Sequence, residues 1–322
     1  MANILVTGGA GFIGSHMVAD LLDAGHAVTV IDNLTSGHRD AVLGGTFRQA
    51  DVSDAAALDA ILGGGRIDAV IHFAASIEAG LSMREPLAFY RNNIGGTLAL
   101  VEGMVRNGVN RVVFSSSAAV YAPDQPQPLG EAGAIAPASP YGATKAASER
   151  LLSDAAAAHG LAVTTLRYFN AAGADPGGRL GERHRPETHL IPLALEAAAG
   201  RAPEFSLFGT DYPTRDGTCI RDFVHVADLV AAHRFALKRL LDGEGGGVFN
   251  LGTGVGHSVR EVVDVCRRVS GKDFSIREKA RRPGDMPVLI ARGDKARSTL
   301  GWSPRFSLDD MVTHAWRFLA AR

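Results

Sequence analysis

The start of the chain constrains its fold most, because it has the pattern of a strand, a glycine-rich turn and a helix. An apolar run at residues 4–6 leads into the turn, and residues 15–24 follow with a helical pattern. Gly8, Gly11 and Gly14 give the turn a G-x-x-G-x-x-G spacing. Such a turn lets backbone N–H groups approach a pyrophosphate at a helix N-terminus, which favours anions. The pattern therefore predicts a dinucleotide-binding unit.

A carboxylate follows the second predicted strand. Residues 27–31 are apolar and end at Asp32, which can accept hydrogen bonds from both hydroxyls of an adenosine ribose. This carboxylate would repel a 2′-phosphate, so Asp32 favours NAD over NADP, although His38 and Arg39 nearby soften that preference. The alternative is a purely structural turn in which Asp32 is a cap.

Strands and helices continue to alternate, which predicts an α/β fold with a doubly wound parallel Rossmann sheet and a smaller C-terminal α/β domain. Residues 1–170 are the predicted NAD-binding domain and 171–322 the substrate domain, and the chain is free to cross back between them. Residues 86–107 read as one long helix, in which Asn92 and Asn93 face either the cofactor or solvent. Further strands are expected at residues 46–49, 69–73, 111–114, 162–168 and 248–251.

Two further strand ends carry candidate nucleotide contacts. Asp51 and Val52 follow the third predicted strand, and the Asp51 carboxylate can reach an adenine amino group or can cap a helix or a turn. Ala74 and Ala75 follow a buried strand, and their small side chains let a dinucleotide lie close. His72, on the same strand, is expected to pack in the core.

A tyrosine and a lysine stand four residues apart, at Tyr141 and Lys145, just after Pro140. Proline is favoured at the first position of a helix, and this spacing places both side chains on one helix face. An ammonium beside a phenol lowers the pKa of the phenol from about 10 and makes tyrosine a base near neutral pH. Ser117, at a strand end upstream, offers a hydroxyl to a substrate oxygen. An ordinary surface helix and a serine-rich turn are the alternatives.

Composition excludes several classes of partner. The chain has 322 residues with 33 Lys+Arg against 34 Asp+Glu and no long run of either sign, which argues against nucleic acid or an anionic membrane. Its two cysteines, Cys219 and Cys266, form neither a disulfide framework nor a metal-site spacing, so no metal and a reducing cytoplasm are predicted. The sequence also lacks a signal-peptide pattern and an apolar run of membrane-spanning length.

Together these residues resemble the extended short-chain dehydrogenase/reductase family, and within it the UDP-hexose 4-epimerases, across essentially the whole chain. The glycine turn and the Tyr-x-x-x-Lys pair are typical of the superfamily, whereas Asp-Tyr-Pro-Thr-x-Asp-Gly-Thr at residues 211–218 is far more specific. The resemblance implies a tightly held NAD, a UDP-sugar lying across the two domains, and a homodimer. Other segments that carry it are residues 7–16, 31–34, 72–74, 114–118, 139–145, 166–170, 221–222 and 250–252.

The resemblance also implies roles for individual residues. Tyr141 would take the proton of the sugar 4-hydroxyl while C4 gives a hydride to NAD, Ser117 would bind O4, and Lys145 would lower the tyrosine pKa and hold the nicotinamide ribose. The predicted cofactor contacts are Gly8, Gly11, Phe12, Ile13, Gly14, Asp32, Asn33, Asp51, Val52, Phe73, Ala74, Ala75, Asn92, Ser115, Tyr141, Lys145 and Tyr168. The predicted substrate contacts are Ser117, Tyr141, Asn170, His189, Leu190, Phe208, Arg221, Arg282, Asp285 and Leu289.

Departures from the family pattern bear on which UDP-sugar the protein would accept. His189 stands where many members have an asparagine, and Leu289 stands where some have a bulky tyrosine, which suggests room for the N-acetyl group of a UDP-N-acetylhexosamine. A 4,6-dehydratase would need an acidic residue beside Ser117, where Ala118 and Ala119 follow instead. Epimerases of UDP-xylose, UDP-arabinose or UDP-glucuronate share the mechanism and remain open. A non-catalytic dinucleotide sensor would not need the serine, tyrosine and lysine together.

Overall fold

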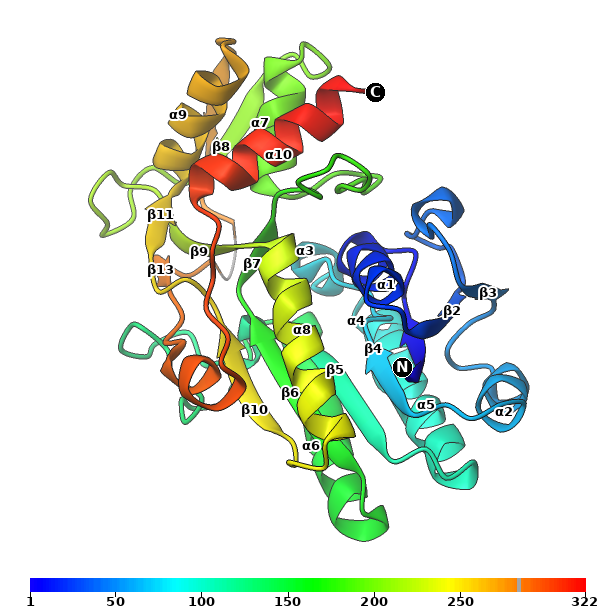
Figure 1. Cartoon of the computed structure of the whole chain (residues 1–322). Helices are drawn as coiled ribbons and strands as arrows, with labels where there is room; N and C mark the ends of the chain where they lie inside the picture. Colours follow the sequence, from blue (N-terminus) through cyan, green and yellow to red (C-terminus); the bar gives the residue numbers. More distant parts are fainter. Residues whose placement is uncertain (283–284) are drawn as a thin grey trace.

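The computed structural model describes residues 1–282 and 285–322, and it has a large lobe and a smaller one (Figure 1). Within the described residues, seven parallel strands form one sheet in the order β10-β6-β5-β4-β1-β2-β3. The order reverses at β1, which is the arrangement of a doubly wound sheet and confirms the predicted fold. The strands are β1 (Asn3–Thr7), β2 (Ala27–Asp32), β3 (Thr46–Gln49), β4 (Ala69–His72), β5 (Arg111–Ser117), β6 (Ala162–Tyr168) and β10 (Gly247–Leu251).

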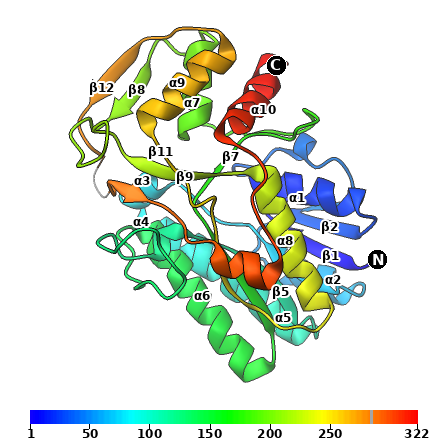
Figure 2. The same ribbon diagram turned by 60° about the vertical axis from the view of Figure 1, so that its left-hand side comes forward.

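Helices cover both faces of this sheet (Figure 2). α1 and α8 pack together on one face, and α2, α5 and α6 cover the other. Successive residues of β1 alternate between the two cores, with Ile4 and Val6 in one and Leu5 in the other, which explains why the strand is apolar throughout. These helices are α1 (Phe12–Asp23), α2 (Ala55–Gly63), α5 (Gly95–Arg106), α6 (Pro140–His159) and α8 (Val226–Leu241).

The long helix expected over residues 86–107 is interrupted. Short α4 (Pro86–Phe89) leads into a π-helical turn, Tyr90–Ile94, and only then into α5. Asn93 sits in that turn, accepts a hydrogen bond from the Ser76 N–H at 2.8 Å and donates one to Thr144 Oγ1 at 2.9 Å. The π turn thus ties the loop after β4 to α6. Such turns occur often at functional sites.

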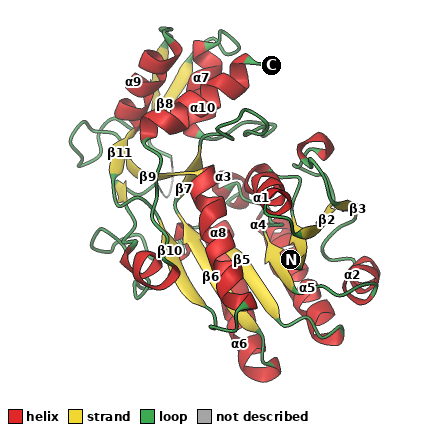
Figure 3. Ribbon diagram, in the orientation of Figure 1, coloured by secondary structure: helices red, strands yellow, loops and turns green. Residues whose placement is uncertain are grey.

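The smaller lobe combines short strands with the helices α7, α9 and α10 (Figure 3). α8 and β10 lie with the large lobe although they follow residue 170, so the chain passes between the lobes more than once. The helices α7, α9 and α10 pack around a separate apolar core. The elements of this lobe are β7 (Asn170–Ala172), α7 (Leu190–Ala198), β8 (Phe205–Phe208), β9 (Ile220–His225), β11 (Gly256–Ser258), α9 (Val259–Ser270), β12 (Ile276–Lys279), β13 (Val288–Leu289) and α10 (Leu308–Ala320).

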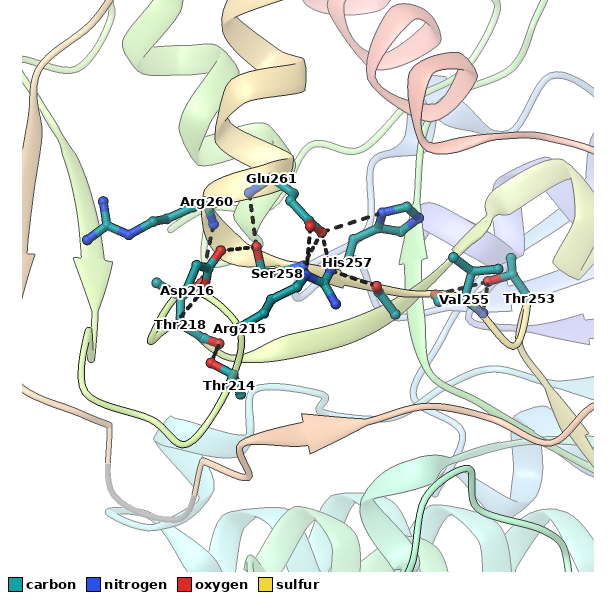
Figure 4. Close-up of polar contacts among 11 residues, drawn as sticks. Thr214, Arg215, Asp216, Thr218, Thr253, Val255, His257, Ser258, Arg260 and Glu261 are labelled. Atoms are coloured by element: carbon teal, nitrogen blue, oxygen red, sulfur yellow. Dashed lines mark hydrogen bonds and ion pairs between the residues drawn. The ribbon is translucent and has the colours of Figure 1, made fainter.

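The specific segment at residues 211–218 has a structural role (Figure 4). Asp216 Oδ1 accepts hydrogen bonds from the N–H and hydroxyl of Thr218, at 2.9 and 2.7 Å, and Asp216 Oδ2 accepts one from Ser258. Ser258 is the N-cap of α9 and forms a capping box with Glu261, to which Arg215 also binds. These contacts therefore attach the segment to the first turn of α9 and fix its conformation.

His72 is a buried core histidine, as the sequence predicts. Its ring is 1% exposed, with Nδ1 2.6 Å from Thr7 Oγ1 and Nε2 3.1 Å from Thr97 Oγ1. Burial, aided by the charge of Lys145, lowers the pKa of His72 to about 3. The ring is consequently neutral in the folded protein at every pH at which the protein is normally handled.

This burial predicts a pH dependence of stability. An unfolded histidine binds a proton below about pH 6.5, whereas folded His72 does not, so its contribution is complete above pH 6.5 and is lost as the pH falls towards 3. The loss between pH 7 and pH 5 amounts to about 2 kcal/mol. Urea unfolding at both pH values should show His72→Gln losing about 2 kcal/mol less than the wild type over that interval. The exposed control His159→Gln should match the wild type, and equal losses in all three proteins would contradict the assignment.

Candidate active site

A cavity of about 740 Å³ lies where the carboxyl ends of the central strands meet the smaller lobe. All of the predicted cofactor contacts line it, and so do the predicted substrate contacts except Leu289. Ligands of doubly wound sheets bind at this edge, next to the strand at which the order reverses. The structure therefore gathers residues from distant parts of the sequence into one site.

The glycine turn leaves no room for side chains. Gly8 has a φ of 69°, and a Cβ there would lie 2.6 Å from the Ala74 backbone nitrogen. A Cβ on Gly14 would lie 2.1 Å from the Gly8 carbonyl oxygen. α1 starts at Phe12 without a side-chain cap, so its first N–H groups are available to an anion. A tight backbone cradle at a helix N-terminus fits the pyrophosphate of a dinucleotide.

Asp32 is held at the cavity wall by the backbone. Its carboxylate is 8% exposed and accepts hydrogen bonds from the N–H of Ala10 at 3.0 Å and of Leu34 at 2.8 Å. A carboxylate oxygen accepts more than one hydrogen bond, so both oxygens retain capacity for ribose hydroxyls. This orientation fits the ribose contact that the sequence predicts.

Asp51 lies beside the nucleotide end of the cavity. Its Oδ2 accepts a hydrogen bond from Asn33 Nδ2 at 2.7 Å, and its Oδ1 accepts one from the Ser53 N–H at 2.8 Å. The helix cap that the sequence offered as an alternative is supplied by Asp54, which accepts from the Ala57 N–H at the start of α2. Asp51 instead caps the turn at Ser53, whose N–H and hydroxyl both donate to Oδ1, and it also lines the cavity.

Tyr141 and Lys145 lie on the same face of α6, as their spacing predicts. The helix begins directly after Ser139, whose hydroxyl accepts a hydrogen bond from the Gly142 N–H at 3.2 Å. Both side chains line the cavity. The Lys145 ammonium is buried and donates to the Ser115 carbonyl oxygen at 2.8 Å. α6 therefore brings a phenol and an ammonium to the end of β5.

The electrostatics of this pair differ from the prediction. Burial raises the pKa of the Tyr141 phenol, and a hydrogen bond with Ser117 offsets that shift only in part. Burial also lowers the pKa of Lys145 to about 8, although Glu149 acts in the opposite direction. The predicted lowering of the tyrosine pKa by Lys145 is therefore wrong for this arrangement, because the ammonium is directed at the Ser115 carbonyl. A proton-accepting Tyr141 needs a positive charge closer to its phenol.

A buried ion pair that the sequence did not reveal supports this site. Arg167 Nη2 lies 2.5 Å from Glu149 Oε2, and the two side chains are 7% and 11% exposed. Ser116 donates to Glu149 Oε1 at 2.5 Å, and Arg167 Nη1 donates to Tyr121 Oη at 3.0 Å. The pair joins α6 to β5 and β6. The available signal was the position of Glu149 four residues after Lys145, on the same helix face.

The sugar-nucleotide side of the cavity carries two guanidinium groups. Arg221 donates to the Met286 carbonyl oxygen at 2.7 Å and lies 3.4 Å from Asp285 Oδ1. The guanidinium of Arg282 lies 4.1 Å from the ring centroid of Phe208. These four charged and aromatic side chains form one wall of the site. Residues 283 and 284, between the two predicted contacts, lie outside the described residues.

Leu289 does not join this wall. It lies in β13 and packs against an apolar cluster of Ala118, Val120, Tyr121 and Leu129. It is not among the described residues that line the cavity. The predicted substrate contact at Leu289, and the hypothesis of room for an N-acetyl group beside it, therefore stay predictions.

The loop before α7 carries residues that the sequence analysis missed. His189 was predicted, but it lies with Glu182, His184 and Glu187 in one cluster. Glu182 Oε1 is 2.6 Å from His189 Nδ1 and 3.0 Å from His184 Nδ1. Burial alone would lower the pKa of His189, but the neighbouring carboxylates raise it to about 10. The missed signal was the E-x-H-x-x-E-x-H spacing.

Comparison with known proteins defines the family. Residues 4–252 match the model of the NAD dependent epimerase/dehydratase family. The chain belongs to this family. NAD is the cofactor, which agrees with the glycine cradle and with Asp32 at the cavity wall.

Full-length relatives share the same fold. The chain is 48% identical over 316 residues to a UDP-glucose 4-epimerase of Halalkalibacterium halodurans, covering 98% of this chain and 95% of that protein. The crystal structure of a Brucella ovis UDP-glucose 4-epimerase in complex with NAD has a TM-score of 0.96 at 46% identity, with 99% and 98% covered. A Bifidobacterium longum UDP-glucose 4-epimerase in complex with NAD⁺ and UDP has a TM-score of 0.95 at 35% identity, again with 99% and 98% covered.

Proposed function

We propose that this protein is a UDP-glucose 4-epimerase that interconverts UDP-galactose and UDP-glucose through a 4-keto sugar. The observation that carries the proposal is the meeting of Ser117, Tyr141 and Lys145 in one cavity with the dinucleotide turn. The full-length similarity to UDP-glucose 4-epimerases supports the same substrate.

The side chains of the cavity divide the chemistry between them. When bound, NAD takes up a hydride from C4 of the sugar and returns it to the opposite face of the 4-keto sugar. Tyr141 accepts the proton of the sugar 4-hydroxyl and gives it back to the new alcohol, while Ser117 holds O4 by a hydrogen bond. In this proposal Lys145, whose ammonium lies at the end of β5, binds the nicotinamide ribose. No net oxidation results, so the enzyme needs no second redox substrate.

The nucleotide end of the substrate is matched by Arg221 and Arg282. Guanidinium groups bind phosphate oxygens through two parallel hydrogen bonds, and both side chains line the cavity. Leu190 and Phe208 supply apolar surface beside them. This wall fits a nucleoside diphosphate whose sugar extends towards Tyr141.

The decisive experiment supplies UDP-galactose to the purified protein without added NAD and follows the anomeric protons by NMR. Formation of UDP-glucose up to equilibrium is expected, and it would show both the reaction and a retained cofactor. If no UDP-glucose forms even after NAD⁺ is supplied, the substrate assignment is wrong. UDP-xylose, UDP-arabinose and UDP-glucuronate are then the substrates to test in the same way.

We also propose that the enzyme is a cytoplasmic homodimer. Both cysteines are buried and free, which suits a reducing compartment. Within the part of the chain that the structure describes, no helix has the length and apolar character needed to cross a membrane. Apolar side chains are exposed along the segment of α4 and α5, with Leu87 at 74% and Leu98 at 45%. A second copy that covers this segment would remove them from water.

The dimer surface can be tested by charge. Leu87→Glu/Leu98→Glu should convert the dimer to a monomer in light scattering, because a second copy would have to bury two carboxylates against apolar surface. Val255→Glu, at a 54% exposed position in the other lobe, should remain dimeric. A monomeric wild type, or a double variant that still dimerises, would exclude this surface.

A further inference from the structure

Four side chains of the loop between β7 and α7 converge on one point. Glu182, His184, Glu187 and His189 each place one ligand atom within 4.8 Å of all the others. The four nitrogen-to-oxygen separations run from 2.6 to 3.9 Å. Donors bound at about 2.0–2.1 Å to a tetrahedral metal ion are about 3.3 Å apart, so the observed spacing brackets that geometry.

The two imidazoles approach the carboxylates without forming hydrogen bonds of normal geometry. His184 Nδ1 and His189 Nδ1 are buried atoms that have no hydrogen-bond partner among the described residues, although Glu182 Oε1 lies 3.0 and 2.6 Å away. Ligand nitrogen and oxygen atoms that lie close together without pointing at one another are expected when all of them point at one shared metal position. Buried polar atoms without partners are rare and call for such an explanation.

The charge of the cluster also suits a divalent cation. The side chains of Glu182 and Glu187 are 6% and 7% exposed, and neither forms an ion pair with a lysine or arginine of residues 1–282 and 285–322. The imidazoles of His184 and His189 are the groups that compensate these carboxylates when no ion is bound. A divalent cation would balance both carboxylates and leave two neutral imidazoles as ligands.

From this geometry we propose that Glu182, His184, Glu187 and His189 form a binding site for a divalent transition-metal ion of the zinc type. Imidazole nitrogen and carboxylate oxygen are ligands that Zn²⁺ takes at such sites. Four protein ligands leave no open position, which is typical of a structural rather than a catalytic metal. A metal here would contradict the absence of a metal that the cysteine spacing predicts, because these ligands are histidine and glutamate rather than cysteine.

The site lies where the loop is already anchored at both ends. Gly181 packs so closely on α10 that a Cβ would lie 2.2 Å from the Phe318 ring, and α7 begins at the residue after His189. The Thr188 and His189 N–H groups donate to Glu187 Oε1 at 2.8 and 2.9 Å, which orients that carboxylate. His184 and His189 line the cavity, so the bound ion fixes one wall of the active site.

The first test uses the full-length wild type without an affinity tag. The protein is stripped with a chelator and titrated with CoCl₂, and the visible absorption is followed. One equivalent of Co²⁺ should give the intense visible bands of a tetrahedral site, and ZnCl₂ should abolish them by displacement. Elemental analysis of protein purified without chelators should find about one zinc per chain. Absence of a saturable tetrahedral band overturns the proposal, and the carboxylates are then balanced by protonated histidines.

Two single substitutions test the ligands. Glu182→Gln and His184→Ala should each weaken Zn²⁺ binding by at least about 100-fold in competition with a chromophoric chelator, since even indirect partners of a metal contribute about 10–100-fold. His159→Ala removes an exposed histidine at the end of α6 and should bind as the wild type does. Zinc should also raise the Tm of the wild type but not of Glu182→Gln. Unchanged zinc affinity in both ligand variants overturns the assignment, whether or not the protein is an epimerase.

Discussion

Tyr141→Phe is expected to lower kcat for the conversion of UDP-galactose by about 10²–10⁴-fold, the range that a positioned general base contributes. The change removes only the phenolic oxygen, so the ring keeps its packing in α6. KM should change little, because the diphosphate contacts of Arg221 and Arg282 lie elsewhere in the cavity. Initial rates by NMR, with the wild type at equal cofactor content, measure the effect.

The control for this substitution is Tyr90→Phe. Tyr90 is 41% exposed and does not line the cavity among the described residues, so its hydroxyl can be removed without touching the reaction. We expect unchanged kcat and KM. A Tyr141→Phe enzyme that keeps more than about a tenth of the wild-type kcat would assign the proton transfer to another group.

The large lobe was predictable because its signals are local. Each strand is a short apolar run, each is followed by a helix, and the glycine turn identifies where the dinucleotide binds. Gly8 and Gly14 had to be glycine for steric reasons that the structure makes explicit, since a Cβ at either would collide with backbone. Asp32 was predictable from its position at the end of a strand. The Tyr141 helix was predictable from the lysine four residues after the tyrosine.

What the sequence could not predict depends on contacts between distant segments. Glu149 and Arg167 are 18 residues apart and meet only because α6 packs back on β6. Leu289 matches a substrate position by pattern, but its packing among apolar neighbours depends on the pairing of β13 with β9, which brings distant segments together. The Lys145 ammonium was expected beside the phenol of Tyr141, whereas in the folded chain it donates a hydrogen bond to the carbonyl oxygen of Ser115. Such contacts depend on how distant segments pack together, which spacing along a helix does not determine.

The buried pair of Glu149 and Arg167 leads to the largest expected loss of stability. Glu149→Gln keeps the shape of the side chain but leaves the Arg167 guanidinium, which is 7% exposed, without a counter-charge. Removing one partner of a buried ion pair costs about 3–5 kcal/mol, because the remaining charge is desolvated and uncompensated. Urea unfolding followed by circular dichroism should show that decrease in the free energy of unfolding.

The same helix supplies a matched control. Arg150 and Asp154 form an ion pair at 2.8 Å on the outer face of α6, with side chains that are 79% and 62% exposed. Asp154→Asn removes one carboxylate charge, as Glu149→Gln does, but water screens the remaining guanidinium, so little or no loss of stability is expected. The difference between the two variants therefore measures burial rather than charge. If both cost the same, the Glu149–Arg167 pair does not hold α6 against β5 and β6, and the precise position of Tyr141 and Lys145 must depend on other contacts of the helix.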